Sequence, residues 1–125
     1  MGKSMVDAFA DAALNYAKNN GVLMTVCNAE PTNYTEASAT YKLADVVIDS
    51  ADFTGPADDA VSPYGRKITT TQQTDVPVDT TGTATHVAIC AAATLILVTT
   101  CTSQALTSGN TVTIPAFKDQ IGDPT

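Results

Sequence analysis

The residues that could do chemistry in this chain are a single histidine, three cysteines and a group of aspartates. His86 and Cys90 are four residues apart in a segment that alternates like a strand, so about 13 Å would separate them, beyond hydrogen-bond reach. Cys27 or Cys101 could approach His86 from a neighbouring strand, but no oxyanion-hole loop or phosphate-binding motif accompanies them. We therefore expect a structural histidine and no enzymatic activity.

Four aspartates between residues 49 and 59 suggest a second kind of chemistry. Asp49, Asp52, Asp58 and Asp59, together with carbonyl groups, could supply the oxygen ligands that calcium needs. Their spacing does not match an EF-hand loop, so a solvated acidic loop is the simpler interpretation, and we expect no metal and no cofactor. The three cysteines form no CxxC pair, which predicts buried reduced thiols rather than a zinc site or a disulfide framework.

Charge limits the partners. The chain has 125 residues with 13 acidic and 6 basic side chains, for a net charge of −7. Such a balance provides no basic stripe for nucleic acid, and an anionic membrane surface would repel it. An apolar content of 44% is typical of a soluble globular protein of one domain. The first residues lack the apolar core of a signal peptide, which predicts folding in a reducing cytoplasm.

The N-terminal segment, residues 1–20, has helical periodicity. We expect one apolar stripe that includes Val6 and Phe9, with polar residues on the opposite face, Ser4 as the N-cap and Gly21 just after the end. The members of the predicted stripe are Val6, Phe9, Ala10, Ala13, Leu14 and Ala17. This helix could pack on the sheet of its own chain, or it could act as an arm that docks on another subunit.

The alternation of apolar and polar residues and the turn signals in residues 21–125 predict strands. Residues 22–27 are apolar on both faces and so would be covered by the helix, and a helical turn at 35–40 precedes a strand at 43–48. The pattern predicts a long loop at residues 49–65 and an edge or exposed strand at 66–73. Because of Pro77, residues 76–78 should lie at a sheet edge or an irregular crossing. Ser108, Gly109 and Asn110 predict a hairpin turn between 104–106 and 111–114.

Residues 86–101 form the most apolar stretch and carry no formal charge. They are too few for a membrane span and contain His86 and several threonines. A buried helix fits by length, but β-branched residues favour two strands joined at residues 91–93. The sequence therefore predicts a mainly β fold, an antiparallel β-sandwich of jelly-roll-like form with one N-terminal amphipathic helix, in a single domain over 1–125.

Three passages resemble small virion structural proteins of tailed bacteriophages. They are VDAFADAALNYAKNNGVLMTVCNAEPTNYTEASATYKLADV, GRKITTTQQ, and GTATHVAIC followed by LILVTTCTSQALTSGNTVTIPAF. Together they cover nearly the whole chain. The resemblance implies a late structural protein of the virion, with no catalytic residues to carry over. It also implies a polar, Gly-containing turn where this chain has three alanines at 91–93.

On this resemblance we expect a capsid decoration (cement) protein that is made in the host cytoplasm and binds the major capsid protein on the capsid surface, where it could form a trimer. The alternatives are a receptor- or glycan-binding module of a head or tail fibre, and a tail or head–tail joining component. We expect two contact regions, the N-terminal segment and the loop at 52–66. The candidate contact residues are Val6, Phe9, Asp52, Phe53, Asp58, Asp59, Tyr64 and Arg66.

Overall fold

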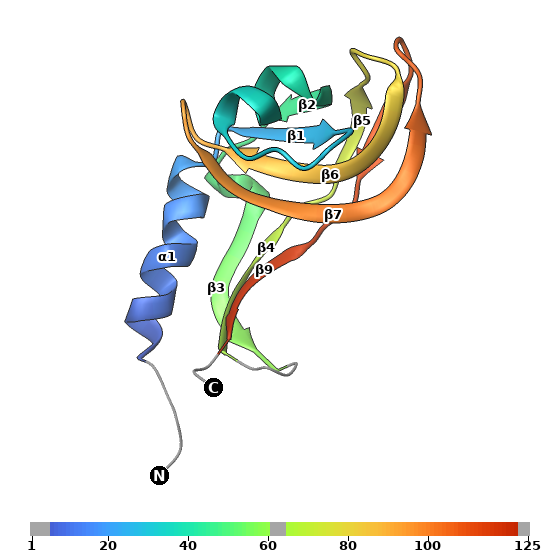
Figure 1. Cartoon of the computed structure of the whole chain (residues 1–125). Coiled ribbons are helices and arrows are strands. Elements are labelled where there is room, and N and C mark those ends of the chain that lie inside the picture. The colour runs from blue at the N-terminus through green and yellow to red at the C-terminus, as the bar shows by residue number, and fades with distance from the viewer. Residues whose placement is uncertain (1–5, 61–64, 123–125) are drawn as a thin grey trace.

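The computed structural model describes residues 6–60 and 65–122 (Figure 1). This part of the chain forms one α-helix, two short helical segments and nine strands. The helical elements are α1 (Asp7–Asn20), the π-helical turn η1 (Glu36–Thr40) and the 3-10 turn η2 (Ser50–Asp52). The strands are β1 (Leu23–Cys27), β2 (Lys42–Val47), β3 (Phe53–Asp59), β4 (Gly65–Thr70), β5 (Gln73–Pro77), β6 (Gly82–Cys90), β7 (Leu95–Leu106), β8 (Thr111–Ile114) and β9 (Lys118–Gly122).

All strand pairs are antiparallel, and the strands form three sheets. Sheet A has the order β2-β1-β6-β7, a second sheet has the order β3-β4-β9, and β5 pairs with β8. The protein is therefore mainly antiparallel β, in a sandwich-like arrangement with one N-terminal helix, which confirms the predicted fold class. In Figure 1, sheet A forms a strongly curved upper body, while α1 and the β3-β4-β9 sheet extend below it. No helix in the described residues is long and apolar enough to cross a membrane.

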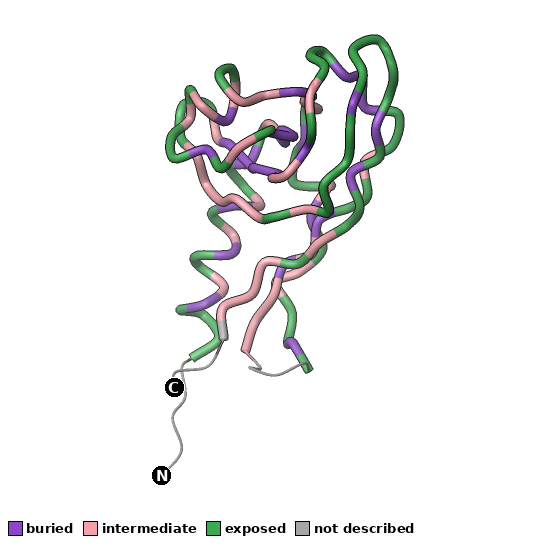
Figure 2. The backbone as a smooth tube through the Cα atoms, turned by 45° about the vertical axis from the view of Figure 1, so that its right-hand side comes forward, coloured by how far each residue is buried: buried purple, intermediate pink, exposed green. Residues whose placement is uncertain are grey.

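Two clusters of buried side chains lie on opposite faces of sheet A. The main cluster joins residues of every sheet to Leu14 of α1. The second cluster is small and packs Ala37 of η1 against Ala88 and Cys90 of β6. Figure 2 shows the buried residues concentrated in the upper body and repeated along α1. The apolar strand β1 is thus covered by the main core and by η1. The prediction that the N-terminal helix covers it was wrong, because α1 packs on the β3-β4-β9 sheet.

The apolar stretch at 86–101 forms two strands, as predicted. β6 and β7 pair from Gly82↔Leu106 to Cys90↔Leu95, and residues 91–94 connect them. The Ala91 N–H donates to the Thr94 carbonyl oxygen at 2.8 Å. None of these four residues has a positive φ. The connection therefore does not need the glycine or asparagine that a tight primed turn requires, and three alanines can occupy it.

Three local predictions were wrong. The expected loop at 49–65 is largely the turn η2 and the strand β3, and β4 lies in the middle of its sheet rather than at an edge. The turn around Gly109 exists, with φ of +92°, but β7 and β8 do not pair across it. Instead, the Val78 N–H donates to the Asn110 carbonyl oxygen at 2.9 Å, and β8 pairs with β5. The chain therefore changes sheets at this turn, from sheet A to the β5-β8 pair.

Candidate interaction surfaces

Arg66 of β4 holds α1 against the β3-β4-β9 sheet. Its Nε and Nη2 donate to the two carboxylate oxygens of Asp11 at 2.8 and 3.1 Å, and its Nη1 donates to Asp58 Oδ1 at 2.8 Å. Asp7 adds a third carboxylate at 3.8 Å from Nη1. These carboxylates, Asp11 above all, raise the pKa of Arg66 further above its ordinary value. A bidentate guanidinium–carboxylate pair fixes orientation as well as distance, so the rotation of α1 is set here.

The second contact that fixes α1 lies near its C-terminal end. Lys18 Nζ donates to the Gly55 carbonyl oxygen of β3 at 2.9 Å. Asp11 and Lys18 are seven residues apart, so both lie on the same side of the helix. The predicted polar face is thus partly turned toward the protein. The helix ends as expected, with the Gly21 N–H donating to the Ala17 carbonyl oxygen at 2.8 Å, whereas Ser4 lies outside the described residues.

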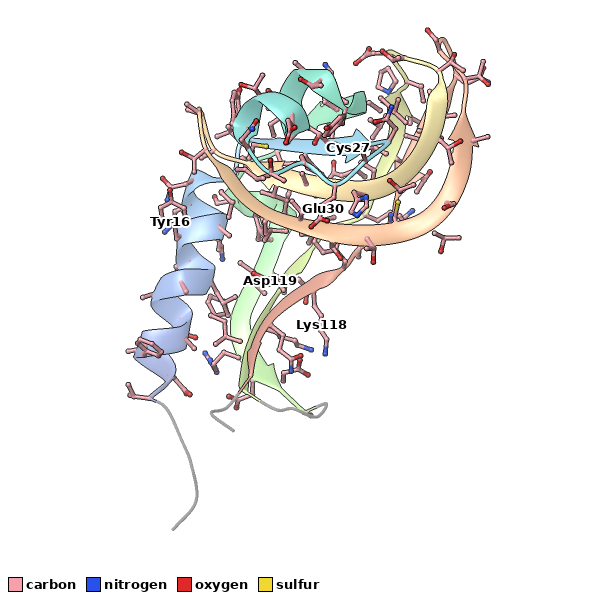
Figure 3. All side chains as sticks on the ribbon, in the orientation of Figure 1. Tyr16, Cys27, Glu30, Lys118 and Asp119 are labelled. Atoms are coloured by element: carbon pink, nitrogen blue, oxygen red, sulfur yellow. The ribbon has the colours of Figure 1, made fainter. Side chains whose placement is uncertain are left out.

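This rotation leaves half of the predicted apolar stripe in solvent. Ala10, Leu14 and Ala17 are buried, as expected. Val6 and Phe9 are each 70% exposed and Tyr16 is 50% exposed, and Ala13 between them is also exposed. We call Val6, Phe9, Ala13 and Tyr16 the outer stripe; Tyr16 lies on the side of α1 away from the sheet (Figure 3). The two candidate residues of this segment, Val6 and Phe9, are therefore available to a partner.

Two candidate residues of the 52–66 region are buried, which corrects the expectation that they contact a partner. The Phe53 side chain packs in the main cluster with 5% exposure. Asp59 is 3% exposed, and its Oδ2 accepts a hydrogen bond from Lys118 Nζ at 2.6 Å. Both lie in β3, where a loop was expected, and one side of a strand faces the interior.

The remaining candidate residues of this region serve the fold or lie outside the description. Asp52 Oδ2 accepts from the Asp49 N–H at 2.9 Å, and its Oδ1 accepts from Gln73 Nε2 at 3.0 Å. Asp58 is exposed but bound to Arg66, whose side chain is only 16% exposed. Tyr64 lies outside the described residues. Of the candidate residues described in the 52–66 region, only Asp58 is therefore exposed.

The four aspartates do not converge on one point. Asp49 and Asp52 form a reciprocal capping box around η2, before the start of β3. Asp58 and Asp59 lie at the other end of β3, about 20 Å away at the usual rise of a strand. Asp59 binds Lys118 and Asp58 binds Arg66, so each already has a cationic partner. No group of metal-ligating side chains occurs within residues 6–60 and 65–122. A shared calcium site of these four residues is thus excluded by their separation.

His86 and the cysteines occupy sheet A. His86 is half-buried on β6, directly opposite Cys27 of β1, and Thr85 Oγ1 lies 2.8 Å from its Nδ1. Cys27 Sγ donates instead to the Ala37 carbonyl oxygen at 3.6 Å. Burial raises the pKa of the Cys27 thiol, and it raises the pKa of Cys90 to about 11. An activated cysteine nucleophile needs the opposite shift, so these thiols behave as packing residues.

A glycan-binding module would need aromatic side chains that can stack on sugars, and the aromatic residues of this chain in or near loops are mostly engaged in other contacts. Tyr34 packs against the second cluster, and Phe117 packs at the margin of the main one. The Tyr41 phenol bonds to the Glu36 carboxylate, which raises the pKa of Tyr41, and hydrogen bonds from Thr32 lower the pKa of Glu36. With Phe53 buried and Tyr64 outside the description, these side chains do not form a stacking platform in the described residues.

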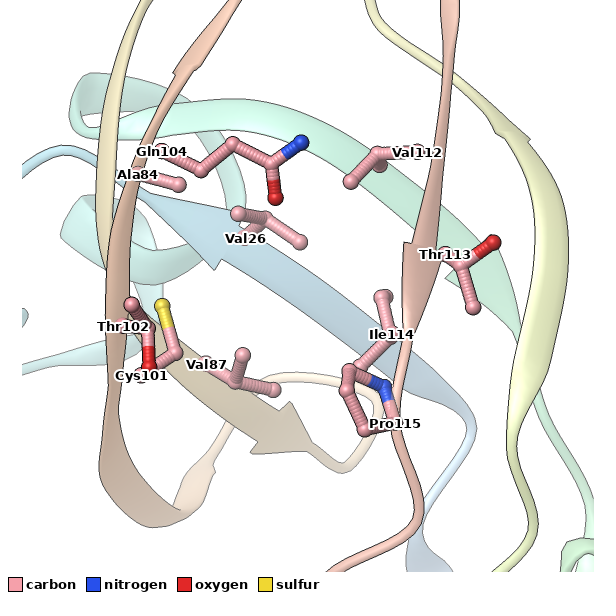
Figure 4. A pocket seen from close by; sticks show the side chains of 10 residues that line it. All are labelled: Val26, Ala84, Val87, Cys101, Thr102, Gln104, Val112, Thr113, Ile114 and Pro115. Carbon is pink, nitrogen blue, oxygen red and sulfur yellow. The ribbon is translucent and has the colours of Figure 1, made fainter.

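A groove that the sequence analysis missed lies between β7 and the segment that follows β8. Two adjoining hollows of about 140 and about 240 Å³ share walls from β6, β7 and residues 114–115. The shared residues are Val87, Cys101, Thr102, Ile114 and Pro115, and Figure 4 shows them around the first hollow. The groove depends on β8 leaving sheet A, so it could be found only after the strand order was known.

The Arg66 contacts lead to a prediction about α1. Asp11→Asn should remove the carboxylate from the bidentate pair, so hydrogen exchange of the α1 amides should become several-fold faster while β1 and β6 stay protected. Asp58→Asn is the matched control, because Asp58 is 87% exposed and makes a single bond to Arg66. Equal effects of the two variants on α1 would contradict the assignment.

A second prediction concerns the thiols. Cys101 is partly exposed and lines the groove, whereas Cys27 and Cys90 are buried. Alkylation at pH 8 should therefore modify Cys101 first, although burial also raises its pKa. A pKa of about 11 leaves Cys90 with about a hundredfold less thiolate than a thiol with the ordinary pKa of 9.0 would have. Peptide mass mapping measures the order; Cys27 or Cys90 reacting as fast as Cys101 in the folded protein would contradict it.

A third prediction uses Asp119, which pairs across the strands with buried Ile68, so the two side chains lie on the same face of the sheet. Burial raises the pKa of Asp119, so the ionised carboxylate costs folding free energy at neutral pH. Asp119→Asn should raise the melting temperature at pH 7. This gain in melting temperature should shrink as the pH falls from the raised pKa of Asp119 in the folded protein to the ordinary pKa of aspartate. Below both pKa values the wild-type carboxyl group is protonated in the folded and in the unfolded state. Thermal unfolding across pH measures it, and a gain that does not depend on pH would reject desolvation as the cause.

Comparisons with known proteins identified no relative of this chain. No protein-family model, curated protein or solved structure matches the chain. The structural basis for a functional proposal is therefore the set of surfaces described above.

Proposed function

We propose that this chain is a structural protein of a tailed-bacteriophage particle that binds the outside of the assembled capsid as a decoration (cement) protein. The observation that carries the proposal is the outer stripe of α1, an apolar helix face in solvent on a helix that Arg66 and Lys18 hold in place. Single exposed apolar residues are ordinary on protein surfaces, but four along one helix face form the kind of patch that binds another protein.

The sequence resemblance supports the identity of that partner. Passages covering nearly the whole chain resemble small virion structural proteins, and these imply the major capsid protein as the binding partner. An amphipathic helix fits an apolar groove through residues spaced by three and four, and Val6, Phe9, Ala13 and Tyr16 follow this spacing. The helix would therefore lie in a groove on or between capsid subunits, and Asp58 is the candidate residue of the 52–66 region that could add to the contact.

The mechanism is linkage between binding and assembly. A protein that binds the assembled lattice, and not its separated subunits, stabilises the lattice by mass action. Many copies on one shell each add a small free energy, so modest affinity at every site is enough to resist expansion. No covalent chemistry is required, which agrees with buried thiols whose pKa values are raised.

The proposal predicts that Phe9→Ala weakens binding to emptied, purified capsids. Truncating a side chain that is buried in the contact removes about 1.5–3 kcal/mol, which corresponds to a loss of roughly tenfold or more in affinity. Co-sedimentation over a range of protein concentrations measures this. Val47→Ala is the matched control, because Val47 is 80% exposed on β2, outside the outer stripe, and should leave binding unchanged.

The same preparation separates this proposal from its main alternative. Host envelope fractions are incubated with the protein in parallel with the capsids. Binding to capsids that depends on Phe9 supports a decoration protein. Binding to envelope fractions alone would favour a receptor-binding module, and full capsid occupancy by the Phe9→Ala variant would reject α1 as the contact.

A further inference from the structure

Strand β7 forms a long free edge of sheet A. One side of β7 pairs with β6, and no described strand pairs with its other side. Between His86↔Thr100 and Ile89↔Leu97 the pairing is regular, and register shifts flank this part on both sides. The six residues from Leu95 to Thr100 span about 20 Å. Along this length the edge presents a row of backbone N–H and C=O groups to any strand that approaches it.

The other outer strands carry features that discourage such pairing. Charged side chains and prolines in an edge strand, or a very short strand, are the usual protection. Examples in the described residues are Lys42 and Asp45 in β2, Pro56 and Asp58 in β3, Asp75 and Pro77 in β5, and Lys118 and Asp119 in β9. β8 has only four residues. β7 is twelve residues long and contains neither a charge nor a proline. Its protection is limited to the two register shifts against β6, on either side of Leu97–Thr100.

The apolar residues of β7 are incompletely buried. Leu95, Ile96, Leu97 and Val98 follow one another, and each remains partly exposed. Ile96 and Leu97 pack at the margin of the main cluster, while Leu95 and Val98 pack at the margin of the second. Both faces of sheet A are therefore only half covered at this edge. One more strand beside β7 would cover both margins and would lie along the groove that contains Cys101.

Charge is excluded from this part of the molecule. Residues 80–117 contain no Asp, Glu, Lys or Arg, although the whole chain has a net charge of −7. β6, β7 and β8 all lie in this interval. Two copies of so acidic a chain repel each other across most faces, because like charges would be brought together and desolvated. They can approach at β7 without that penalty.

From these observations we propose that the free edge of β7 binds the β7 edge of a second copy of this chain. The two strands pair antiparallel about a two-fold axis, which joins the two copies of sheet A into one continuous sheet. A pair centred on Val98 sets Ile96 opposite the second copy's Thr100 and Leu97 opposite the second copy's Thr99, so aliphatic and β-branched residues face each other. Both free edges are consumed, so the assembly closes at two copies.

A second copy fits better than an unrelated strand for a reason present in the chain itself. The same edge supplies both partners, and every register within Leu95–Thr100 is free of charge on both sides. The inference does not depend on capsid binding, which was assigned to α1. It also differs from the trimer that the sequence resemblance allows, because an antiparallel pair of identical edges has two-fold symmetry.

The test is the solution mass of the full chain and of two variants over protein concentrations from 1 to about 100 µM. Light scattering after gel filtration and sedimentation equilibrium should give twice the 12.9 kDa chain mass for the wild type. Thr100→Lys places a charge on an exposed position of β7 and should raise the dimer dissociation constant about tenfold or more. Thr111→Lys adds the same charge at an exposed position of β8 and should leave the dimer intact.

A second readout keeps the result interpretable if Thr100→Lys lowers stability. Hydrogen exchange of the β7 amides should slow as the wild-type concentration rises. The Thr100→Val variant keeps an uncharged β-branched residue, so it should show the same slowing or form a tighter dimer. A monomer at 100 µM, a trimer, or a dimer equally insensitive to both lysines would overturn the proposal. Protection of β7 that appears only with capsids would assign the edge to a capsid strand instead. Phe9→Ala separates capsid binding from β7 pairing, because it should leave the dimer intact.

Discussion

The pairing of Arg66 with Asp11 decides which side of α1 the protein shows to solvent. Without a fixed partner, an amphipathic helix would turn its whole apolar stripe inward, because burial of apolar area is the dominant favourable term. Here the Arg66 guanidinium donates two hydrogen bonds to the Asp11 carboxylate, at 2.8 and 3.1 Å, and this pair fits only one rotation of α1. The Lys18–Gly55 contact is compatible with the same rotation. Leu14 still reaches the core, but Phe9 and Tyr16 cannot. A polar constraint therefore creates the apolar surface that a partner would bind.

In sheet A, strand order rather than a polar contact decides which apolar residues are exposed. Apolar side chains are almost fully buried in the central strands and only partly buried in the edge strand β7. β1 and β6 have a strand on each side and a cluster on each face, so Thr25, Ala88 and Ile89 are fully buried. β7 has a strand on one side only, and β8, which could have extended the sheet, leaves to pair with β5. The open groove and the half-buried aliphatic residues of β7 both follow from this departure. They arise from strand order, not from local composition.

The sequence was informative where periodicity is local and uninformative where contacts are long-range. The β6–β7 pair and the end of α1 at Gly21 follow from β-branched residues and from a glycine. The burial of Phe53 and Asp59 could not be predicted, because Gly55, Pro56 and two aspartates in β3 are typical of a loop. The rotation of α1 depends on Arg66, 55 residues away from Asp11, and no pattern within the helix encodes it. The absence of charged residues at 80–117 can be read from the sequence. Its relation to a possible interface could be inferred only once the strand order showed that β7 is an edge strand.

The two proposed surfaces lie on different parts of the molecule, and this separation bears on how they would act together. α1 extends below the upper body, whereas β7 runs along the outside of the curved sheet A (Figure 1). A two-fold pair joined at β7 uses no residue of α1, so each copy would carry its own outer stripe. Two linked helices bind neighbouring sites with an effective concentration set by their fixed spacing, so a modest affinity at each helix becomes a much larger one for the pair. The small outer stripe would then be sufficient for stable binding to the capsid, even though it contains only Val6, Phe9, Ala13 and Tyr16.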